Sequence, residues 1–412
     1  MTSDLVSVVE VGTTRTVLAA GCAAEGGVQL LAFAEQETTG MRKGRVADAD
    51  YVARAVRTVR EEAESQLPRG GSIVDTALVC SLGEVSCDPV EAEVPVTGDE
   101  GRVDMADVRR VRDALVAAAP LAPGRVRLGG TMSLYYTLDG RSEEILEPLD
   151  MSASRLGMHG MSVTADQVEY DRLSDAVSGG GLDVNFEIFS GIAAAAGALS
   201  RQKMEDGALC ICLGGGTTVY SAFRHRHPIA AGAVPVGGDH VTNDLMSAFR
   251  PGSAMLAGRL KLESGRADAE AVDPSARVPM PQEPGGPVRT VSARAVAQVV
   301  AARMDETLRL VRADLDARGV LPWLGGGVVL TGGGAAMPGL PGMVSRIFGA
   351  PCSVAELRTG VEEFDRDGAR NAVIWGALCK AIRHQRRQAA REAEGGVRGF
   401  FRKIFSREGD EK

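Results

Sequence analysis

Paired cysteines and aromatic residues are both scarce in this chain of 412 residues. The seven cysteines are odd in number and scattered, with no CxxC pair and no Cys/His cluster. This pattern predicts reduced thiols and argues against a disulfide framework or a zinc site. Cys210 and Cys212 lie two apart in an apolar stretch, so packing on one face of a strand explains them better than metal binding. Aromatic residues make up only 4% of the chain, which argues against a binding module rich in Tyr and Trp.

Long apolar runs are missing as well, because nowhere do about eighteen apolar residues follow one another. The N-terminal residues show no basic segment followed by an apolar one. We therefore expect neither a secretory leader nor a membrane-spanning helix. The net charge of −8 is mildly acidic, yet from Lys380 to Arg407 basic residues dominate and face only Glu392 and Glu394. Positive charge is thus concentrated near the C-terminal end.

The length and the 51 glycines predict an α/β protein of at least two lobes, since one core rarely grows this large. A strand, a Gly-Thr-Thr turn and a second strand fill residues 6–22, and the same unit recurs at 208–223. This repeat implies two similar lobes. Between them, residues 84–163 mix strand-like and helical patterns and predict a small inserted α+β subdomain. Long helices are expected at 48–65, 105–118 and 292–318, and the Pro/Gly-rich segment 273–287 is expected to be loop.

The two repeated turns form the main candidate site. Glycine lets a backbone approach a ligand closely, and threonine adds hydroxyl donors, so one such turn in each lobe predicts a clamp for a polyphosphate. One turn alone would be explained equally well as an ordinary β-turn, but a third glycine-rich turn at 331–334 makes the set more specific. The predicted phosphate-binding residues are Gly12, Thr13, Thr14, Gly214, Gly215, Gly216, Thr217 and Thr218.

These motifs resemble the actin, Hsp70 and sugar-kinase superfamily: residues 9–14 resemble its first phosphate motif, 212–218 its second and 329–337 its adenosine motif. Within it, the segments 40–44, 237–244 and 328–340 resemble the FtsA family, in the same order and at similar spacing. The resemblance implies an actin-like two-lobed fold that binds ATP and Mg²⁺. It places lobes at 1–83 (with 164–200 and 356–380) and 201–355, a subunit-contact subdomain at 84–163, and a charged linker at 381–395.

The resemblance also implies roles for single residues. Adenosine would be bound by Gly332, Gly333, Gly334 and Lys261, although Gly258 stands where relatives carry a glutamate. Arg303 lies in the long helix where FtsA proteins expose basic residues to the C-terminal peptide of FtsZ, and an ordinary solvated arginine is the alternative. His240, at the start of a predicted helix, is better explained as a structural residue than as a catalyst.

Four positions depart from the family pattern. Glu10 replaces an aspartate near the metal, and Cys212 replaces a second aspartate, although a thiol suits Mg²⁺ poorly. Val219 stands in place of an acidic residue, and Ser190 is the only polar group where relatives orient the attacking water. We predict ATP binding with little or no hydrolysis, and no catalytic residue is assigned.

The last motif is a short basic amphipathic helix at 396–407. At about 100° per residue, its apolar residues fall within an arc of roughly 140°. Packing on the protein's own core is the alternative, but Gly395 and Gly396 make the segment separable, so we predict that it binds anionic membrane lipid. The predicted membrane-binding residues are Val397, Phe400, Phe401, Ile404 and Phe405, with Arg398, Arg402 and Lys403.

The leading functional hypothesis is therefore a filament-forming adaptor at the cytoplasmic face of the membrane at the division site. Its expected partners are the FtsZ C-terminal peptide, further copies of itself, lipid and other division proteins, with no nucleic acid. The first alternative is a true ATPase or phosphotransferase of the same superfamily, which the missing carboxylates at Cys212 and Val219 disfavour. The second is a pilus-assembly ATP-binding protein, which typically lacks the segment at 40–44 and the terminal helix.

Overall fold

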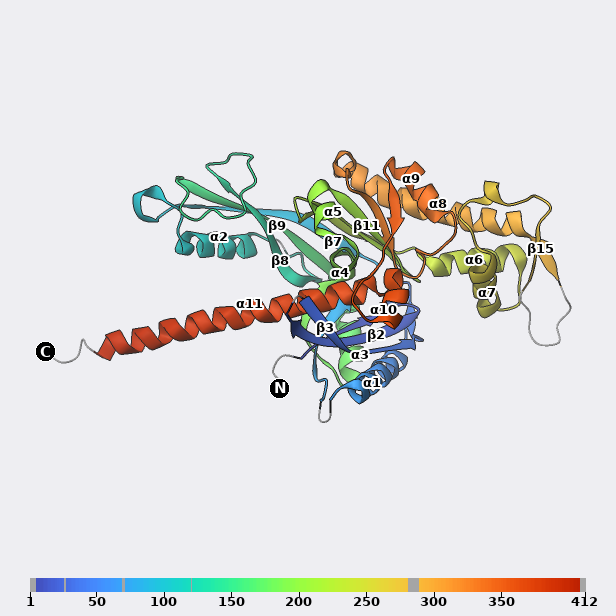
Figure 1. Ribbon diagram of the computed structural model, residues 1–412, viewed down its shortest axis with the longest axis horizontal. Coiled ribbons are helices and arrows are strands. Elements are labelled where there is room, and N and C mark those ends of the chain that lie inside the picture. Colours follow the sequence, from blue (N-terminus) through green and yellow to red (C-terminus); the bar gives the residue numbers. More distant parts are fainter. Residues whose placement is uncertain (1–4, 26, 69–70, 120, 281–288, 408–412) are drawn as a thin grey trace.

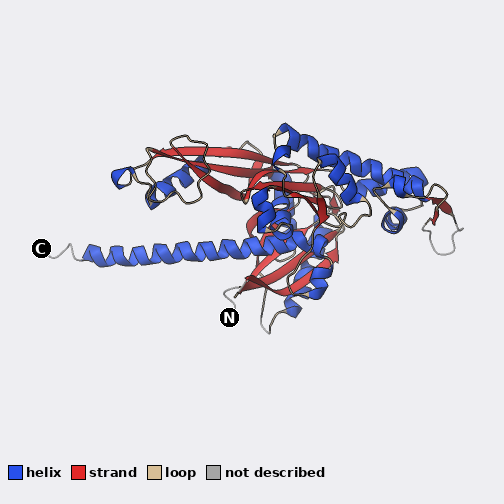
Figure 2. Cartoon of the chain, turned by 45° about the horizontal axis from the view of Figure 1, so that its top comes forward, coloured by secondary structure: helices blue, strands red, loops and turns tan. Residues whose placement is uncertain are grey.

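The computed structural model describes residues 5–25, 27–68, 71–119, 121–280 and 289–407, with side chains described as far as Gln388, Glu363 excepted. Two β-sheet lobes lie one above the other, a smaller subdomain extends to one side, and a long helix, α11 (Gly368–Arg407), projects from the body (Figures 1 and 2). None of the helices in the described ranges is both long enough and apolar enough to span a bilayer.

The first lobe is a five-stranded sheet in the order β10-β6-β1-β2-β3. The strand pair β1 and β2 is an antiparallel hairpin, and β6 joins β1 in parallel. Helices α1 (Ala49–Gln66) and α3 (Gln167–Gly179) cover one face, and α4 (Ser190–Ala198) with α11 covers the other (Figure 1). The strands are β1 (Val6–Val11), β2 (Arg15–Ala24), β3 (Gly27–Glu37), β6 (Asp75–Cys80) and β10 (Asp183–Phe189).

The second lobe repeats this plan in the order β13-β12-β11-β16-β17. Here β11 and β12 form the antiparallel hairpin and β16 joins β11 in parallel, so the predicted internal repeat is confirmed. The strands are β11 (Ala208–Leu213), β12 (Thr218–Arg224), β13 (His227–Val234), β16 (Gly327–Thr331) and β17 (Cys352–Val354). The helices are α5 (Arg201–Asp206), α6 (Gly238–Phe249), α7 (Ala254–Ser264), α8 (Ala293–Ala317) and α9 (Leu340–Phe348).

The inserted subdomain is a three-stranded antiparallel sheet, β7-β9-β8, backed by helix α2 (Met105–Ala118), which begins and ends where the sequence predicts. Its strands are β7 (Val85–Pro95), β8 (Arg125–Leu138) and β9 (Arg155–Asp166). The sequence pattern did not reveal β9, the middle strand, because Gly157 and Gly160 interrupt its alternation and most of its residues are buried. The subdomain has its own core, which includes Val111, Leu115 and Met158.

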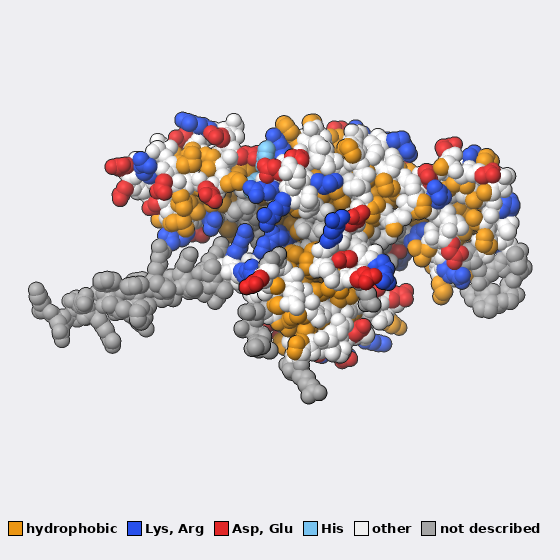
Figure 3. All heavy atoms as spheres, viewed as in Figure 1, with side chains coloured by type: hydrophobic (Ala, Val, Ile, Leu, Met, Phe, Trp, Pro, Cys, Tyr) orange, Lys and Arg blue, Asp and Glu red, His pale blue; other side chains and the backbone are white. Residues whose placement is uncertain are grey.

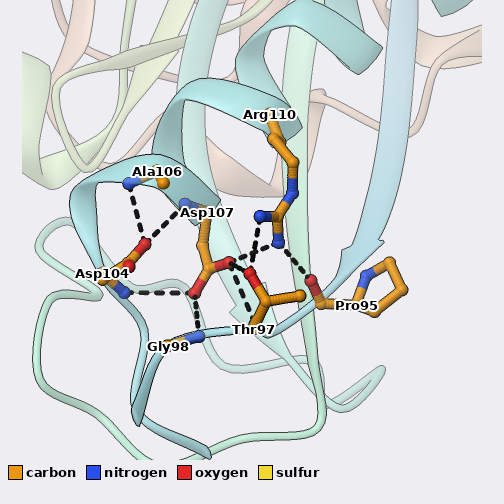
Figure 4. Close-up of polar contacts among 7 residues, drawn as sticks. All are labelled: Pro95, Thr97, Gly98, Asp104, Ala106, Asp107 and Arg110. Carbon is orange, nitrogen blue, oxygen red and sulfur yellow. Dashed lines mark hydrogen bonds and ion pairs between the residues drawn. The ribbon is translucent and has the colours of Figure 1, made fainter.

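A buried carboxylate fixes the start of α2 (Figure 4). Asp107 accepts hydrogen bonds from the backbone N–H groups of Thr97, Gly98 and Asp104 and from the Thr97 hydroxyl, at 3.0–3.3 Å. Arg110 forms an ion pair with the same carboxylate and also donates to Thr97 and Pro95. Burial raises the pKa of Asp107, but these hydrogen bonds outweigh it and hold the pKa below its usual value.

Two further differences concern the connecting segments. The segment expected to be loop at 273–287 contains strand β14 (Arg277–Pro279), which pairs with β15 (Thr290–Ser292), so that expectation was wrong in part. At the C-terminal end, α11 runs as one helix through the residues assigned to a linker. The remaining short elements are β4 (Met41–Arg42), β5 (Arg45–Val46), α10 (Glu362–Arg366) and 3₁₀ turns at Asp99–Gly101, Ala269–Ala271 and Leu321–Trp323.

Helices α4 and α11 approach each other very closely and hold the first lobe together. A Cβ atom on Gly197 would lie 1.9 Å from the carbonyl oxygen of Ala372, and one on Gly376 would lie 2.0 Å from that of Ala193. Only glycine fits at both positions. This contact fixes the first turns of α11 at the junction between the lobes, where the candidate site lies.

Candidate nucleotide cleft between the lobes

A cavity of about 680 Å³ opens between the two lobes. Its size suits a small organic ligand such as a nucleotide. All three predicted glycine-rich turns contribute to its wall, and Gly216 is the only predicted phosphate-binding residue that does not line it. The lining residues from these turns are Gly12, Thr13, Thr14, Gly214, Gly215, Thr217, Thr218, Gly332, Gly333 and Gly334.

The two hairpin turns have the same internal geometry. In the first, the Gly12 N–H donates to the Arg15 carbonyl at 2.9 Å, and in the second the Gly214 N–H donates to the Thr217 carbonyl at 3.0 Å. Each turn joins two antiparallel strands at the edge of the cavity. The repeated sequence unit therefore produces a repeated backbone shape, with one copy in each lobe.

The two turns also contact each other across the cleft. A Cβ atom added to Gly215 would lie 2.5 Å from Cγ2 of Thr14. One added to Gly216 would lie 2.4 Å from Oγ1 of Thr13 and 2.9 Å from the backbone nitrogen of Gly44. These contacts are far below ordinary van der Waals distance, so the lobes come this close only because both positions are glycine.

The start of α6 is stacked on the second turn. The Gly238 N–H donates to the Gly214 carbonyl at 2.9 Å, and the Asp239 N–H donates to the Gly215 carbonyl at 2.8 Å. Lys261, from α7, donates through Nζ to the Gly238 carbonyl at 2.9 Å and lies in the cavity wall. Burial lowers the pKa of Lys261, and the nearby Asp239 carboxylate opposes that shift. A cation at this position suits an anionic or carbonyl-bearing ligand.

The third turn is tied to both lobes. The Gly332 N–H donates to the Ala369 carbonyl of α11 at 2.8 Å, and the Gly334 N–H donates to the Leu213 carbonyl at 3.0 Å. Gly332 has a φ of 85°, and its Cβ atom would lie 2.6 Å from the Leu213 oxygen. Glycine is therefore required at Gly332, and a Cβ atom on Gly334 would lie 2.9 Å from Cβ of Leu213, whereas Gly333 has open space around it.

At the base of the cleft, Glu10 and Cys212 lie close enough to influence each other. Burial raises the pKa of Glu10, against the opposing effects of Arg15 and Ser81. Burial, and then the charge of Glu10, raise the pKa of Cys212 to about 12, so its thiol stays protonated at neutral pH. A protonated thiol is a poor ligand for a hard cation.

The donor set therefore does not fit a Mg²⁺ ion bound directly by protein. Among the described residues there is no group of three or more His, Cys, Asp or Glu side chains arranged to hold a metal. Glu10 and Asp239 are the two carboxylates in the cavity wall. Mg²⁺ has been predicted here through the family resemblance, and its ligands would have to come from phosphate and water.

Two of the positions predicted to depart from the family pattern, Val219 and Ser190, are placed differently with respect to the cleft. Val219 lines the cleft and supplies no acceptor. Ser190 is 1% exposed, and its hydroxyl has no hydrogen-bond partner among the described residues. It begins α4 and does not line the cavity, so it is not placed to orient a water on a bound nucleotide.

Arg303 lies on α8 and is engaged in ion pairs. Its guanidinium bonds both carboxylate oxygens of Asp244 on α6, at 2.6 and 3.0 Å, and also contacts Glu306. Its role in binding FtsZ stays a prediction. His240 accepts a hydrogen bond from the Gly237 N–H through Nδ1 at 3.2 Å, which fits a structural part in capping α6.

The tail residues from Val397 to Phe405 are part of the α11 backbone, but their side chains lie outside the described residues.

Sequence reasoning missed several residues of the cleft. Arg15 directly follows the first turn, and Arg370 and Val373 come from the first turns of α11. Only Arg15 could have been found from the motif, since the others reach the cleft by tertiary packing. Further missed lining residues are Asp239, Leu262, Met304, Thr307, Met337 and Pro338.

Arg15 forms the link between the first turn and α11. It donates to Oδ1 of Asn371 at 3.0 Å, to the Arg370 carbonyl, and to Glu35 at 2.8 Å. Its side chain is only 12% exposed. The first phosphate turn and the base of the long helix are thus joined through one buried guanidinium.

Comparison with known proteins agrees with this fold. Residues 209–374 match the family model "Cell division protein FtsA", and residues 83–164 match "SHS2 domain inserted in FTSA". The chain is 30% identical over 379 residues to the cell division protein FtsA of Agrobacterium fabrum, covering 86% of this chain and 83% of that protein.

Two solved structures show the fold alone, because their sequence identities are low. The PilM-PilN type IV pilus biogenesis complex is 16% identical, with a TM-score of 0.63 over 92% of this chain and 98% of that chain. MreB5 of Spiroplasma citri bound to ADP is 14% identical, with a TM-score of 0.52 over 91% of this chain and 95% of that chain. With its two actin-like lobes, its inserted subdomain and relatives at this identity, the chain belongs to the FtsA family of cell-division proteins.

Proposed function

We propose that this cell-division protein binds ATP in the cleft, assembles into filaments, and tethers FtsZ to the inner face of the cytoplasmic membrane. The observation that carries the nucleotide part is the cleft itself. Three glycine-rich turns from two lobes converge on one cavity of about 680 Å³. Except at Gly333, a Cβ atom added to any glycine of these turns would lie less than 3 Å from a neighbouring atom, and such turns can present backbone N–H groups to phosphate.

ATP is expected to act as a structural ligand. The N–H groups of Gly12, Gly214 and Gly332 hold their turns in shape by donating to backbone carbonyl oxygens, so the shape of the turns does not depend on carboxylates at positions 212 and 219. A nucleotide that touches both turns would hold the lobes together. The closed arrangement would then determine the surface that binds a second copy of the chain in a filament. Nothing in the described cleft favours the alternative of an active ATPase or phosphotransferase. The alternative of a pilus protein rests on a likeness of fold at 16% identity.

Membrane binding is assigned to the tail at 396–407. Three phenylalanines and an isoleucine, partly buried in lipid, would each contribute on the order of 1 kcal/mol. Each basic residue would add about 1 kcal/mol over anionic lipid. After the cost of ordering the tail, one copy binds weakly. A filament multiplies the copies, so avidity would hold the assembly on the bilayer.

The test is co-sedimentation of the full chain with phosphatidylglycerol vesicles, with and without ATP and FtsZ. We expect the protein to pellet with vesicles, more completely with ATP, and to carry FtsZ with it. Phe400→Asp is the matched variant and should abolish vesicle binding while leaving a folded protein that still binds ATP. FtsZ pelleting that does not depend on this protein, or full vesicle binding by Phe400→Asp, would contradict the tether.

A further inference from the structure

A cluster of basic residues lies on α11 just where the helix leaves the body. We call Arg383, Arg386 and Arg387 the α11 basic face, and all three are exposed. No carboxylate forms an ion pair with any of them among the described side chains. Among the described residues, Arg383 donates to the Cys379 carbonyl of its own helix, at 3.1 Å. Figure 3 shows Lys and Arg side chains gathered over this part of α11.

Like charges crowd one another in this cluster. Lys380, one turn earlier, is partly buried, and burial together with the charges of Arg383 and Arg387 lowers its pKa to about 8. Elsewhere in the chain, exposed arginines commonly pair with a carboxylate, as Arg259 does with Glu263. Positive charge that no described carboxylate neutralises favours the binding of an anion.

The basic face is turned away from the body. On α11, Leu378, Ala381 and Ile382 are buried against the first lobe. The ring of His384 stacks on Phe186 of β10, with 4.0 Å between the ring centroids. At about 100° per residue, Arg383 and Arg387 lie roughly opposite these buried residues, and Arg386 lies at the edge of the buried side, about 40° from Ile382. Their face is therefore open along the projecting helix (Figure 1).

The register of α11 aligns this face with the tail. The backbone is one continuous helix from Gly368 to Arg407. Counted at about 100° per residue, the three arginine positions fall inside the same arc of roughly 140° that holds the apolar tail positions. Each arginine stands about five helical turns before an apolar residue. The pairs are Arg383 with Phe401, Arg386 with Ile404 and Arg387 with Phe405.

We propose that α11 lies along the bilayer over its whole projecting length, with Arg383, Arg386 and Arg387 binding the phosphate groups of anionic lipids. This rests on the proposed membrane tether and extends it toward the body. Guanidinium groups bind phosphate oxygens in pairs of hydrogen bonds, and the helix carries them at about the height of the headgroups. The body is then held against the membrane at a fixed rotation, with the contact extending about 33 Å from Arg383 to Phe405.

The first experiment measures vesicle binding by the full chain when the three arginines are changed to glutamine. Each basic residue near an anionic surface changes affinity roughly fivefold, so the triple variant should bind phosphatidylglycerol vesicles about a hundredfold more weakly. The matched control changes Arg109, Arg259 and Arg309 to glutamine, which removes the same charge at exposed sites away from α11. It should bind like the natural chain.

Phe400→Asp separates this inference from the tether. If Phe400→Asp abolishes binding while the triple variant binds like the natural chain, the tether stands and the α11 basic face does not bind lipid. If Phe400→Asp binds fully, the tether itself is wrong. A triple variant that keeps vesicle binding but loses FtsZ would show that the face binds an acidic protein, which also overturns the lipid assignment.

The second experiment tests the register. Two alanines inserted after Gln388 turn the tail by about 200° relative to the basic face, whereas seven alanines restore the phase to within about 20°. We expect the shorter insertion to weaken vesicle binding by about as much as the triple variant, and the longer one to leave it nearly unchanged. Equal binding by both insertions would show that the two segments act independently, and the continuous membrane-facing helix would be wrong.

Discussion

Changing Gly216 to alanine should weaken ATP binding by keeping the two lobes apart. The new Cβ atom would lie 2.4 Å from Oγ1 of Thr13, and 2.9 Å from both the Gly44 nitrogen and the Lys43 Cα. The threonine can rotate, but two of the three contacts are with backbone of the opposite lobe. Relief therefore requires the lobes to separate by several tenths of an ångström, and ATP has to close them again.

The size of the effect follows from the cost of overpacking, typically about 1–3 kcal/mol. Gly216 does not line the cavity, so the alanine touches no ligand and acts only on closure. If this free-energy cost destabilises only the closed state, which binds ATP, the apparent Kd for ATP rises roughly fivefold to a hundredfold. The unfolding temperature without ligand should change little, since the open form relieves the contact.

Isothermal titration with a non-hydrolysable ATP analogue measures the Kd, and thermal unfolding confirms that the variant is folded. Gly342→Ala is the matched control, because its Cβ atom would meet only the end of the Arg346 side chain at 3.8 Å. A folded Gly216→Ala protein with an unchanged Kd would refute the reasoning, since the turns would then not meet in the nucleotide-bound state.

Three further outcomes are expected. The natural chain should bind ATP without measurable phosphate release, since losing a positioning group costs about 10² to 10⁴ in rate. Robust ATP turnover by the natural chain would contradict this prediction. The Cys212→Asp variant should bind ATP with an affinity that depends on Mg²⁺. Asp107→Asn should destabilise the inserted subdomain by about 2–3 kcal/mol in urea unfolding. Because the folded-state pKa of Asp107 is lowered, its contribution to stability is present above the unfolded-state pKa and is lost as the pH falls through the folded-state pKa. If the stability lost in Asp107→Asn does not depend on pH, the ionised carboxylate is not the stabilising group. Arg303→Glu should weaken binding of the FtsZ C-terminal peptide in an anisotropy titration and leave ATP affinity unchanged; an unchanged peptide affinity would leave Arg303 as an ion-pair partner of Asp244.

Much of the fold could be predicted because local patterns determine it. Strong alternation and helical periodicity located β1, α2 and α8, and the repeated Gly-Thr-Thr unit revealed the two lobes. The middle strand β9 was missed, because it is buried along most of its length and its glycines hide the alternation. The β14–β15 pair was missed because a three-residue ladder leaves almost no local pattern.

Some features of the candidate site could likewise be predicted from the sequence, and others could not. The sequence by itself determined the glycine-rich turns, since their chemistry lies in consecutive residues that glycine alone allows. It also determined that Cys212 and Val219 stand where the resemblance to the family predicts carboxylates, which is a matter of residue identity.

Only the tertiary structure decided what these turns meet. It brought Gly216 of the second lobe against Thr13 of the first, about 200 positions away in the chain, and it carried Arg370 of α11 into the cleft wall. It also showed that α11 is one continuous helix from the body to the tail, where the sequence had favoured a separable linker. Such contacts join residues far apart in the chain, and their distances depend on how sheets and helices pack, which no local pattern records.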